Sequence, residues 1–462
     1  MTTPVASRPA ILYIECTPTV RFDHGTGIPR VVRNVVQHAI RIGRDRGIEV
    51  RPIAFTNGAF FAARLSAEGS LVTLMAENVM QPSWRMRVKE RYRAVINGTG
   101  RIFPPGRARQ WWVAPGADPG LTRTLRRILR RKISADAEPP LALVLAPDAV
   151  AFRPGDTVLA AEPFLDRAYL TAFLALRSKG IRLACIAYDL IPIRHPEYVS
   201  VNFLAAFRNW VDRLVAGSDL VVAISEVIRD DVTTYLADLG NAARPVDQRV
   251  TWFHLGHDLE RASAEGTVRR RIVRIFDRHD AGPVFLMVGW LDPRKNQGFV
   301  LDSMATLRQA GIPFRLLVIG KRGRGTDAYY SRLRADPELA RSVHTFHDAT
   351  DTELAYCYSH SAGLIYPSTT EGFGLPLVEA LAHGTRVFAS DIPIFREIGQ
   401  GFVSFFPLDD PQVLTDKLHR FCVAGEFDAP REIAEFHWPT WRESVERLLD
   451  VMLEPQTEEQ SA

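Results

Sequence analysis

The chain has 462 residues, 46% of them hydrophobic and 24% charged, with a net charge of +4; this composition is typical of a globular protein and argues against disorder. At roughly 100–200 residues per domain, the length suits two large domains. Four cysteines without a CxxC pair argue against a paired-cysteine zinc or redox site and against a disulfide scaffold, and favour a reducing cytoplasm. No run of about 18 apolar residues and no apolar stretch near Met1 occur, so we expect neither a membrane-spanning helix nor a secretory signal.

The chain opens with a predicted strand over residues 11–14, followed by a loop that ends in Gly25-Thr26-Gly27. A helix follows, with Pro29 in its first turn and apolar residues spaced for one buried face. Strand, glycine loop and helix form the opening unit of a doubly wound α/β domain. The glycine loop alone is also compatible with a simple turn, because such loops are common.

The middle of the chain is less regular. Turn residues, tryptophans and a basic run predict an insertion of helices and loops at about residues 60–137. Further strands are predicted at residues 141–145, 158–160, 183–187 and 220–223. A charged stretch at 260–280 separates this half from the next.

The second half alternates more regularly. Strands are predicted at residues 284–288, 315–319, 343–346, 363–366 and 387–389, with helical patterns between them, as parallel βαβ units require. From Thr440 we expect one amphipathic helix with Trp441, Val445, Leu448, Leu449 and Met452 on one face, and then a polar tail without order. Two α/β domains in tandem bind ligands at loops that follow the carboxyl ends of their strands.

The most specific motif follows the predicted strand 363–366. Glu371 and Glu379 enclose Gly372-Phe373-Gly374-Leu375-Pro376, which exposes backbone N–H groups at a helix N-terminus and suits a phosphate. Carboxylates accept hydrogen bonds from vicinal hydroxyls, so both glutamates suit a sugar. A tight turn with a glutamate in the helix is the alternative, but it requires neither both glycines nor both glutamates.

Three other positions carry candidate chemistry. Lys295 and its neighbour Arg294 lie on a predicted strand-end loop and suit phosphate, although a solvated basic turn has the same composition. Asp189 follows another predicted strand and is a candidate base or sugar contact, or else a strand-end cap. Arg30 adds positive charge near the phosphates if it faces the crevice, and is otherwise a solvated helix residue.

These motifs, in this order, resemble those of the family 4 retaining glycosyltransferases with the GT-B fold. Glu371 and Glu379 resemble the E-x7-E signature of that family, and residues 288–296 its phosphate-contacting loop. Residues 25–31 resemble its N-terminal glycine loop, and residues 188–197 its central active-site segment. Shorter matches at 218–226 and 255–258 extend the resemblance over nearly the whole chain.

The resemblance implies an α/β GT-B fold, with two Rossmann-like doubly wound domains facing across a crevice. Residues 1–262 would form the acceptor domain with its basic insertion, residues 263–435 the donor domain, and 436–462 a helix packing back on the first domain and the tail. Glu371 would contact the donor hexose, Glu379 the ribose, and Lys295 with Arg294 the diphosphate. The backbone of Gly372, Phe373, Gly374 and Leu375 would cradle sugar and phosphate. Glu371, Asp189 and Lys295 would be catalytic, and the phosphate and acceptor loop would comprise Gly25, Thr26, Gly27, Arg30 and Tyr188.

The implied activity is retaining transfer of a hexose from a nucleoside diphosphate sugar to a glycan or lipid-linked glycan. The opening and central segments resemble those of bacterial mannosyltransferases that assemble surface polysaccharides such as lipopolysaccharide or capsule. We therefore expect GDP-mannose as the donor. Two departures, Trp290 for a common Arg and Tyr188 for a common His, motivate the alternative of an inactive binding or scaffold subunit. Sugar-nucleotide hydrolysis, epimerisation and sucrose-type synthesis are further alternatives within the fold.

Histidines at His24, His195 and His257 show no metal-ligand spacing, so we expect no metal and no cofactor beyond the donor substrate. Cations and helix dipoles would then stabilise the leaving diphosphate.

A basic segment spans residues 84–132. It holds fourteen Lys and Arg against two acids, a net charge of +12, which leaves −8 for the rest of the chain. Arg126, Arg127, Arg130 and Arg131 alternate with apolar residues as in a cationic amphipathic helix, which predicts contact with an anionic inner-leaflet membrane. The alternatives are a solvated charged face and nucleic acid, but no nucleic-acid motif accompanies the run. We therefore expect a cytoplasmic protein, peripheral on the inner membrane face.

Overall fold

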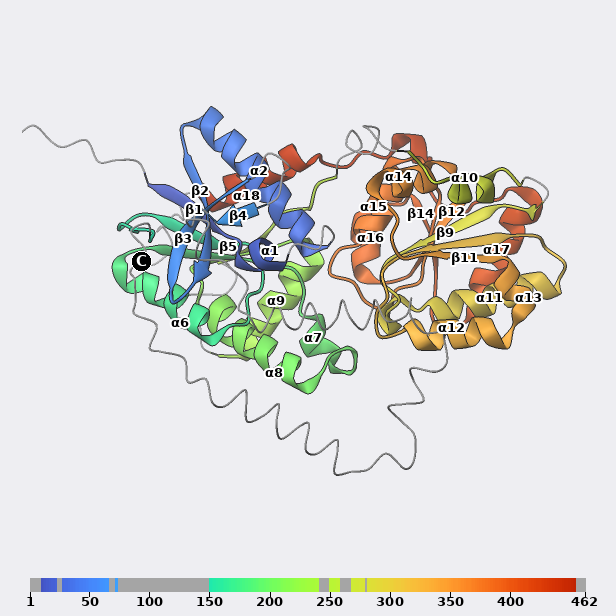
Figure 1. Ribbon diagram of the computed structural model, residues 1–462, viewed down its shortest axis with the longest axis horizontal. Coiled ribbons are helices and arrows are strands. Elements are labelled where there is room, and N and C mark those ends of the chain that lie inside the picture. Colours follow the sequence, from blue (N-terminus) through green and yellow to red (C-terminus); the bar gives the residue numbers. More distant parts are fainter. Residues whose placement is uncertain are drawn as a thin grey trace, which may run out of the picture. The chain divides into compact units, whose positions relative to one another are not determined.

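The computed structural model describes residues 10–22, 27–65, 71–73, 149–240, 249–257, 267–278 and 281–453. Two α/β sheets, of eight and six strands, organise this part of the chain (Figure 1). By its internal contacts the chain divides into one compact unit of Met1–Val72 with Ala151–Ala462 and another of Thr73–Val150. In the described part, no helix combines the length and the apolar character needed to cross a bilayer.

The eight-stranded sheet lies in the first half of the chain. Its strands, in spatial order, are β4 (Leu71–Thr73), β3 (Ala59–Leu65), β2 (Glu49–Thr56), β1 (Ile11–Glu15), β5 (Thr157–Ala160), β6 (Arg182–Ala187), β7 (Leu220–Ala223) and β8 (Val250–Trp252). From β2 to β8 all neighbouring strands pair in parallel. The strands after residue 140 were predicted, except β8, and the predicted strand at 141–145 lies outside the described residues.

The prediction of helices and loops from residue 60 onward is wrong at its start. β3 pairs antiparallel with β2, with Thr56 opposite Ala59. Asn57 and Gly58 make the two-residue turn, with φ of 49° and 82°. Asn-Gly in this conformation is the favoured hairpin turn, because its twist matches that of the flanking strands. The sheet therefore extends beyond β2 by a hairpin.

Helices cover this sheet. They are α1 (Thr17–Phe22), α2 (Ile28–Arg46), α6 (Arg167–Ala175), α7 (Ile191–Arg194), α8 (Val201–Trp210) and α9 (Glu226–Asp238). α2 begins after Gly27, with Pro29 in its first turn, and buries the apolar face that its spacing predicts, including Val32 and Val36.

The six-stranded sheet is wholly parallel. Its spatial order is β11 (Val343–Phe346), β10 (Arg315–Ile319), β9 (Val284–Val288), β12 (Gly363–Tyr366), β13 (Val387–Ser390) and β14 (Val403–Phe406). All but β14 were predicted: β9, β12 and β13 are largely apolar runs, as strands buried on both faces are, and the edge strand β11 is more polar and only half-buried. The strand order reverses between β9 and β12, and ligands of such folds bind beyond the carboxyl ends of the strands at that point.

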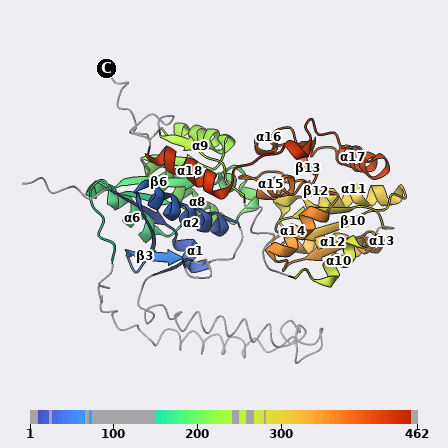
Figure 2. The same ribbon diagram turned by 90° about the horizontal axis from the view of Figure 1, so that it is seen from above.

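Helices lie on both faces of the six-stranded sheet (Figures 1 and 2). One face carries α11 (Gln297–Gln309), α12 (Thr326–Ala335), α13 (Pro337–Arg341) and α17 (Pro411–Ala424), whose apolar residues share one buried core with β9 and β10. The other carries α10 (Arg270–Phe276), α14 (Asp351–His360), α15 (Leu375–Ala382) and α16 (Pro393–Gly399). These two sheets with their helices confirm the prediction of two Rossmann-like α/β domains.

The last helix, α18 (Trp441–Leu453), packs against α2 of the first sheet (Figure 1). Its buried residues include all five of the predicted apolar face. The carboxylate of Asp450 lies 2.6 Å from Arg46 of α2, which ties the two helices at the surface. The two segments that connect the sheets run together: the Trp438 indole donates to the Leu255 carbonyl at 2.8 Å, and the His257 amide donates to the Pro439 carbonyl at 3.1 Å.

Candidate active site

The candidate active site is built on the loops after β9 and β12, which flank the reversal of strand order in the six-stranded sheet. The first loop turns at Gly289, whose φ of 140° favours glycine, and contains a short 3-10 helix over Pro293–Lys295. The second runs from Pro367 into α15. The backbone amide of Thr369 donates to the Arg294 carbonyl at 2.9 Å, so the two loops are hydrogen-bonded to each other.

Glu371 lies at the centre of this pair of loops. One carboxylate oxygen accepts hydrogen bonds from the Lys295 ammonium and, at 2.6 Å, from the Ser368 hydroxyl. The other oxygen lies 2.5 Å from Nη1 of Arg294. The Glu371 side chain is only 8% exposed, so these three contacts replace the water that a carboxylate normally keeps.

Charge and burial compete within this cluster. Burial raises the pKa of Glu371, but the charges of Lys295 and Arg294 outweigh it and hold this pKa at about 2. Burial lowers the pKa of Lys295, and the Glu371 charge opposes that shift. Lys295 and Arg294 thus place two cations beside one Glu371 carboxylate, an arrangement that suits the binding of an anion.

Tyr366 supports the cluster from the end of β12. Its hydroxyl accepts from Nζ of Lys295 at 3.1 Å, and the ammonium lies 4.9 Å from the ring centroid. Its ring stacks on Phe395 at 4.7 Å. Tyr366 was not predicted as a site residue, because a tyrosine at the end of an apolar strand has the same sequence pattern as a core residue.

The Gly-Phe-Gly segment is held by packing. Phe373 is buried, with its ring centroid 6.0 Å from that of Trp438. Gly374 has a φ of 116°, and a Cβ there would lie 2.9 Å from Ile398 and Phe395 side-chain atoms. α15 begins directly after it at Leu375, with Pro376 in the first turn. Since the Phe373 side chain is committed to the core, only backbone groups of this segment are available to a ligand.

Glu379 pairs with Arg30, the residue from the opening helix of the chain. Their side chains meet at 2.5 Å, and the Tyr358 hydroxyl donates to the other Glu379 oxygen at 3.0 Å. The Glu379 charge is the main cause that raises the pKa of Arg30. Arg30 therefore contacts the E-x7-E segment rather than standing as a solvated residue. Of the glycine loop, Gly27 caps α2, whereas Gly25 and Thr26 lie outside the described residues.

Asp189 lies against Gly372. A Cβ at Gly372 would be 3.0 Å from Oδ2 of Asp189 and 2.8 Å from the Tyr188 carbonyl, so only glycine permits this approach. The carboxylate also accepts from the Ile191 amide at 3.0 Å, as a strand-end cap does. Burial raises the pKa of Asp189, and the nearby Glu371 charge adds to this while Arg294 opposes it. Asp189 is thus electrostatically coupled to the cluster.

Tyr188, which the resemblance implies for the phosphate and acceptor loop, points into the protein. Its side chain is buried, and its hydroxyl donates to the Ala161 carbonyl at 2.9 Å. Trp290, the other departure from the family pattern, is 49% exposed at the end of β9, and Arg294 supplies the guanidinium near Glu371.

The predicted absence of a metal site is not contradicted. Within the described ranges, no three His, Cys, Asp or Glu side chains are grouped as metal ligands. His257 bonds to the Trp438 carbonyl, and His195 lies 3.2 Å from Glu197. The predicted membrane patch of Arg126, Arg127, Arg130 and Arg131 lies outside the described residues, as does His24.

The comparisons with known proteins support the GT-B fold and a resemblance to glycosyltransferases. Residues 268–426 match the family described as Glycosyl transferases group 1. Sucrose-phosphate synthase from Thermosynechococcus elongatus has a TM-score of 0.55 at 14% identity, with 95% of each chain covered. Anabaena Alr3699/HepE, solved with UDP and glucose, has a TM-score of 0.53 at 13% identity, covering 97% of this chain and 100% of that one.

Within that class the chain resembles bacterial mannosyltransferases. It is 29% identical over 307 residues to the serotype-specific mannosyltransferase WbdA of Escherichia coli, covering 66% of this chain and 38% of WbdA. It is 35% identical over 116 residues to the O-antigen chain mannosyltransferase RfbU of Salmonella typhimurium, covering 25% of this chain and 31% of RfbU. The chain thus spans little more than a third of the length of WbdA.

Proposed function

We propose that the chain transfers mannose from GDP-mannose to a glycan or lipid-linked glycan acceptor, with retention of anomeric configuration. The observation that carries the proposal is the buried group of Lys295, Arg294 and Glu371 at the reversal point of the six-stranded sheet. The choice of mannose is supported by the names of the relatives WbdA and RfbU.

The donor diphosphate would bind between the two cations and the N-terminus of α15. Charge-assisted hydrogen bonds from Lys295 and Arg294, together with the helix dipole, would stabilise the diphosphate as it leaves. The same cations hold Glu371 in the structure. We infer that the diphosphate competes for them, which would free a Glu371 oxygen to accept a hydrogen bond from a hexose hydroxyl.

Asp189 would receive the proton of the acceptor hydroxyl. Its raised pKa makes it a stronger base than an exposed aspartate, and its contact with Gly372 places it beside the donor loop. The acceptor hydroxyl would attack the face from which the nucleotide departs.

The test is release of nucleoside diphosphate from a panel of sugar nucleotides, with and without glycan acceptors, followed by NMR of the product's anomeric proton. Acceptor-dependent release from GDP-mannose with retention would support the proposal. Release that needs no acceptor would indicate hydrolysis or epimerisation. Binding without turnover across the panel would indicate a binding or scaffold subunit.

Glu379→Ala is expected to raise KM for the donor about tenfold with little change in kcat, because a ribose contact is remote from the bond that breaks. Initial rates over a range of donor concentrations would measure both constants. Glu446→Ala, which removes a half-buried partner of Arg442 on α18, is the control and should change neither constant. A fall in kcat with unchanged KM would remove the ribose assignment.

Activity is expected to survive a strong chelator. Lys295, Arg294 and the α15 N-terminus would carry the charge of the diphosphate without a divalent ion. Rates before and after treatment with EDTA and passage over a chelating resin would test this. Loss of activity that one divalent cation restores would show that the reaction needs that metal.

The basic segment 84–132 is proposed to hold the enzyme on the cytoplasmic face of an anionic membrane, where lipid-linked acceptors reside. Each Lys or Arg near such a surface contributes about 1 kcal/mol, and raising salt to 1 M shortens the Debye length to about 3 Å. Sedimentation with anionic vesicles is expected at low salt and not at 1 M. Replacing Arg126, Arg127, Arg130 and Arg131 by Gln should abolish it and leave donor turnover unchanged. Equal binding to neutral and anionic vesicles would contradict the claim.

A further inference from the structure

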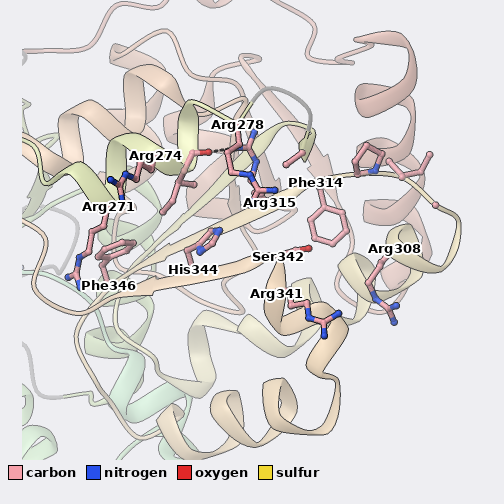
Figure 3. A pocket seen from close by; sticks show the side chains of 15 residues that line it. Arg271, Arg274, Arg278, Arg308, Phe314, Arg315, Arg341, Ser342, His344 and Phe346 are labelled. Atoms are coloured by element: carbon pink, nitrogen blue, oxygen red, sulfur yellow. Dashed lines mark hydrogen bonds between the residues drawn. The ribbon is translucent and has the colours of Figure 1, made fainter.

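A cavity lies in the domain of the six-stranded sheet (Figure 3), and none of its lining residues belongs to the candidate active site. Its volume is about 850 Å³, within the range of small-ligand pockets. It is lined by α10, by the turn that leads into β10, by Arg315 at the start of β10, by β11 as far as its last residue Phe346, and by Arg308 of α11 and Arg341 of α13. Ile275, Ile312, Phe314 and Phe346 give it an apolar wall.

Neither Asp nor Glu is among the residues that line this cavity. Six arginines line it: Arg271, Arg274, Arg278, Arg308, Arg315 and Arg341. Figure 3 shows these side chains around His344 and Phe314. We call this feature the arginine pocket.

Half of these arginines have acidic partners outside the lining. Arg341 lies 2.5 Å from Glu338, whereas the Arg271–Asp348 and Arg308–Asp336 distances are 3.5 and 3.4 Å. Both of these distances are long for an ion pair, and both partners of the Arg271–Asp348 pair are exposed, so these contacts neutralise only part of the charge.

The other three arginines concentrate positive charge at the pocket. Arg315 is buried and donates to the carbonyls of Ile275 and Gly282. Arg274 and Arg278 are exposed on and just after α10, and neither guanidinium has a hydrogen bond or ion pair to another described residue. Burial lowers the pKa of His344, and the charges of Arg315 and Arg278 lower it further. The pocket therefore has a positive potential that nothing among its lining residues cancels.

The position of the pocket separates it from the donor site. Arg315 begins β10, and the catalytic loops follow the carboxyl ends of the same parallel sheet. Four residue steps along a strand span about 13 Å, so a diphosphate at Lys295 does not reach Arg315, and none of the lining residues belongs to the loops after β9 and β12.

We propose that the arginine pocket binds a ligand that carries a phosphate group next to an apolar portion. Guanidinium groups form paired hydrogen bonds with phosphate oxygens, and the apolar wall would cover the rest of the ligand. Two sources share this chemistry, a free phosphorylated small molecule and the headgroup of an anionic lipid. The inference does not depend on the proposed transfer reaction.

Titration calorimetry with phenyl phosphate and with inorganic phosphate would test the proposal on the full-length protein. Phenyl phosphate should bind more tightly than inorganic phosphate. Arg274→Gln with Arg278→Gln should weaken phenyl phosphate binding by about tenfold or more, since charge-assisted contacts are lost. The control, Arg213→Gln with Arg270→Gln, removes two exposed arginines outside the pocket, one of them on α10 itself, and should bind as the wild type does. Melting curves would confirm that both variants fold.

Further variants and lipids separate the sources and the sites. Binding that persists in Lys295→Ala places phenyl phosphate at the arginine pocket, and binding lost only in Lys295→Ala would overturn the proposal. Reduced sedimentation of the pocket variant with phosphatidylglycerol vesicles, compared with the control variant, would assign a lipid headgroup. Unchanged sedimentation with lost phenyl phosphate binding would assign a free phosphorylated molecule. No phenyl phosphate binding by the wild type, or equal binding by both double variants, would overturn the proposal.

Discussion

Replacing Lys295 by alanine is expected to lower donor turnover by about 10²–10³-fold while the protein stays folded. Removing one preorganised charge from a leaving group costs about 2–4 kcal/mol of barrier. The fold should persist because Arg294 and Ser368 continue to hold the Glu371 carboxylate. Single-turnover release of nucleoside diphosphate would measure the loss, and circular dichroism would check the fold.

The donor domain offers a matched control for this variant. Lys417 is as buried as Lys295, with side chains 12% and 13% exposed, and it also pairs with a carboxylate, that of Asp428. Lys417→Ala should therefore affect stability similarly and leave turnover intact. Near-normal turnover in folded Lys295→Ala would refute the assignment of Lys295 to the diphosphate.

Replacing Glu371 by alanine or glutamine is expected to abolish transfer to a similar extent, because the hexose loses a charged acceptor and the two cations lose their arrangement. The change should also reduce stability by about 3 kcal/mol, as when one partner of a buried pair is removed. With so small a fraction of the side chain exposed, solvent screening reduces this effect little.

The pH dependence of stability gives this second prediction a separate signature. The folded pKa of Glu371 is about 2, below its usual 4.5, so the unfolded chain binds more protons between these values. The stabilisation, about 3 kcal/mol, is therefore fully present above pH 4.5 and is lost as the pH falls toward 2. Denaturant unfolding at several pH values should show this loss in the wild type and a smaller one in Glu371→Gln.

Glu353 separates stability from catalysis. Its carboxylate is also buried and lies 2.6 Å from Nη2 of Arg269, outside the candidate active site. Glu353→Gln should lower the free energy of unfolding yet preserve transfer. Equal loss of transfer in both glutamine variants would mean that Glu371 acts on the fold alone.

The sequence predicted the donor half better than the first half, for a physical reason. The buried strands β9, β10, β12 and β13 are largely apolar runs, so they were predicted, and the edge strand β11 was predicted from its place in the alternation of strands and helices. β3 was missed because the Asn57-Gly58 turn was not read as a hairpin, and its strand was assigned to the insertion. β8 has only three residues, too few to show any period.

The sequence predicted which loops form the candidate site, but not which side chains contact one another there. Parallel strands end at one edge of a sheet, so Lys295 and Glu371 were expected on two strand-end loops that face the same crevice. That Glu371 holds both cations follows from side-chain geometry, which sequence spacing does not determine. Nor does spacing reveal that Arg30 reaches Glu379, 349 positions away, or that Tyr188 turns inward.

The packing of α18 on α2 makes the donor half, in topological terms, an insert within the first domain. The chain leaves the eight-stranded sheet after β8 and forms the six-stranded sheet. It then returns beside the segment that follows β8, where the Trp438 indole donates to the Leu255 carbonyl. A shortened chain that ends before Trp441 would thus expose the apolar surface that α18 covers in the first domain, and it would keep every strand of the second. To exchange the six-stranded domain between relatives, an internal segment would have to be replaced. Its two junctions would lie next to each other, one after β8 and one before α18.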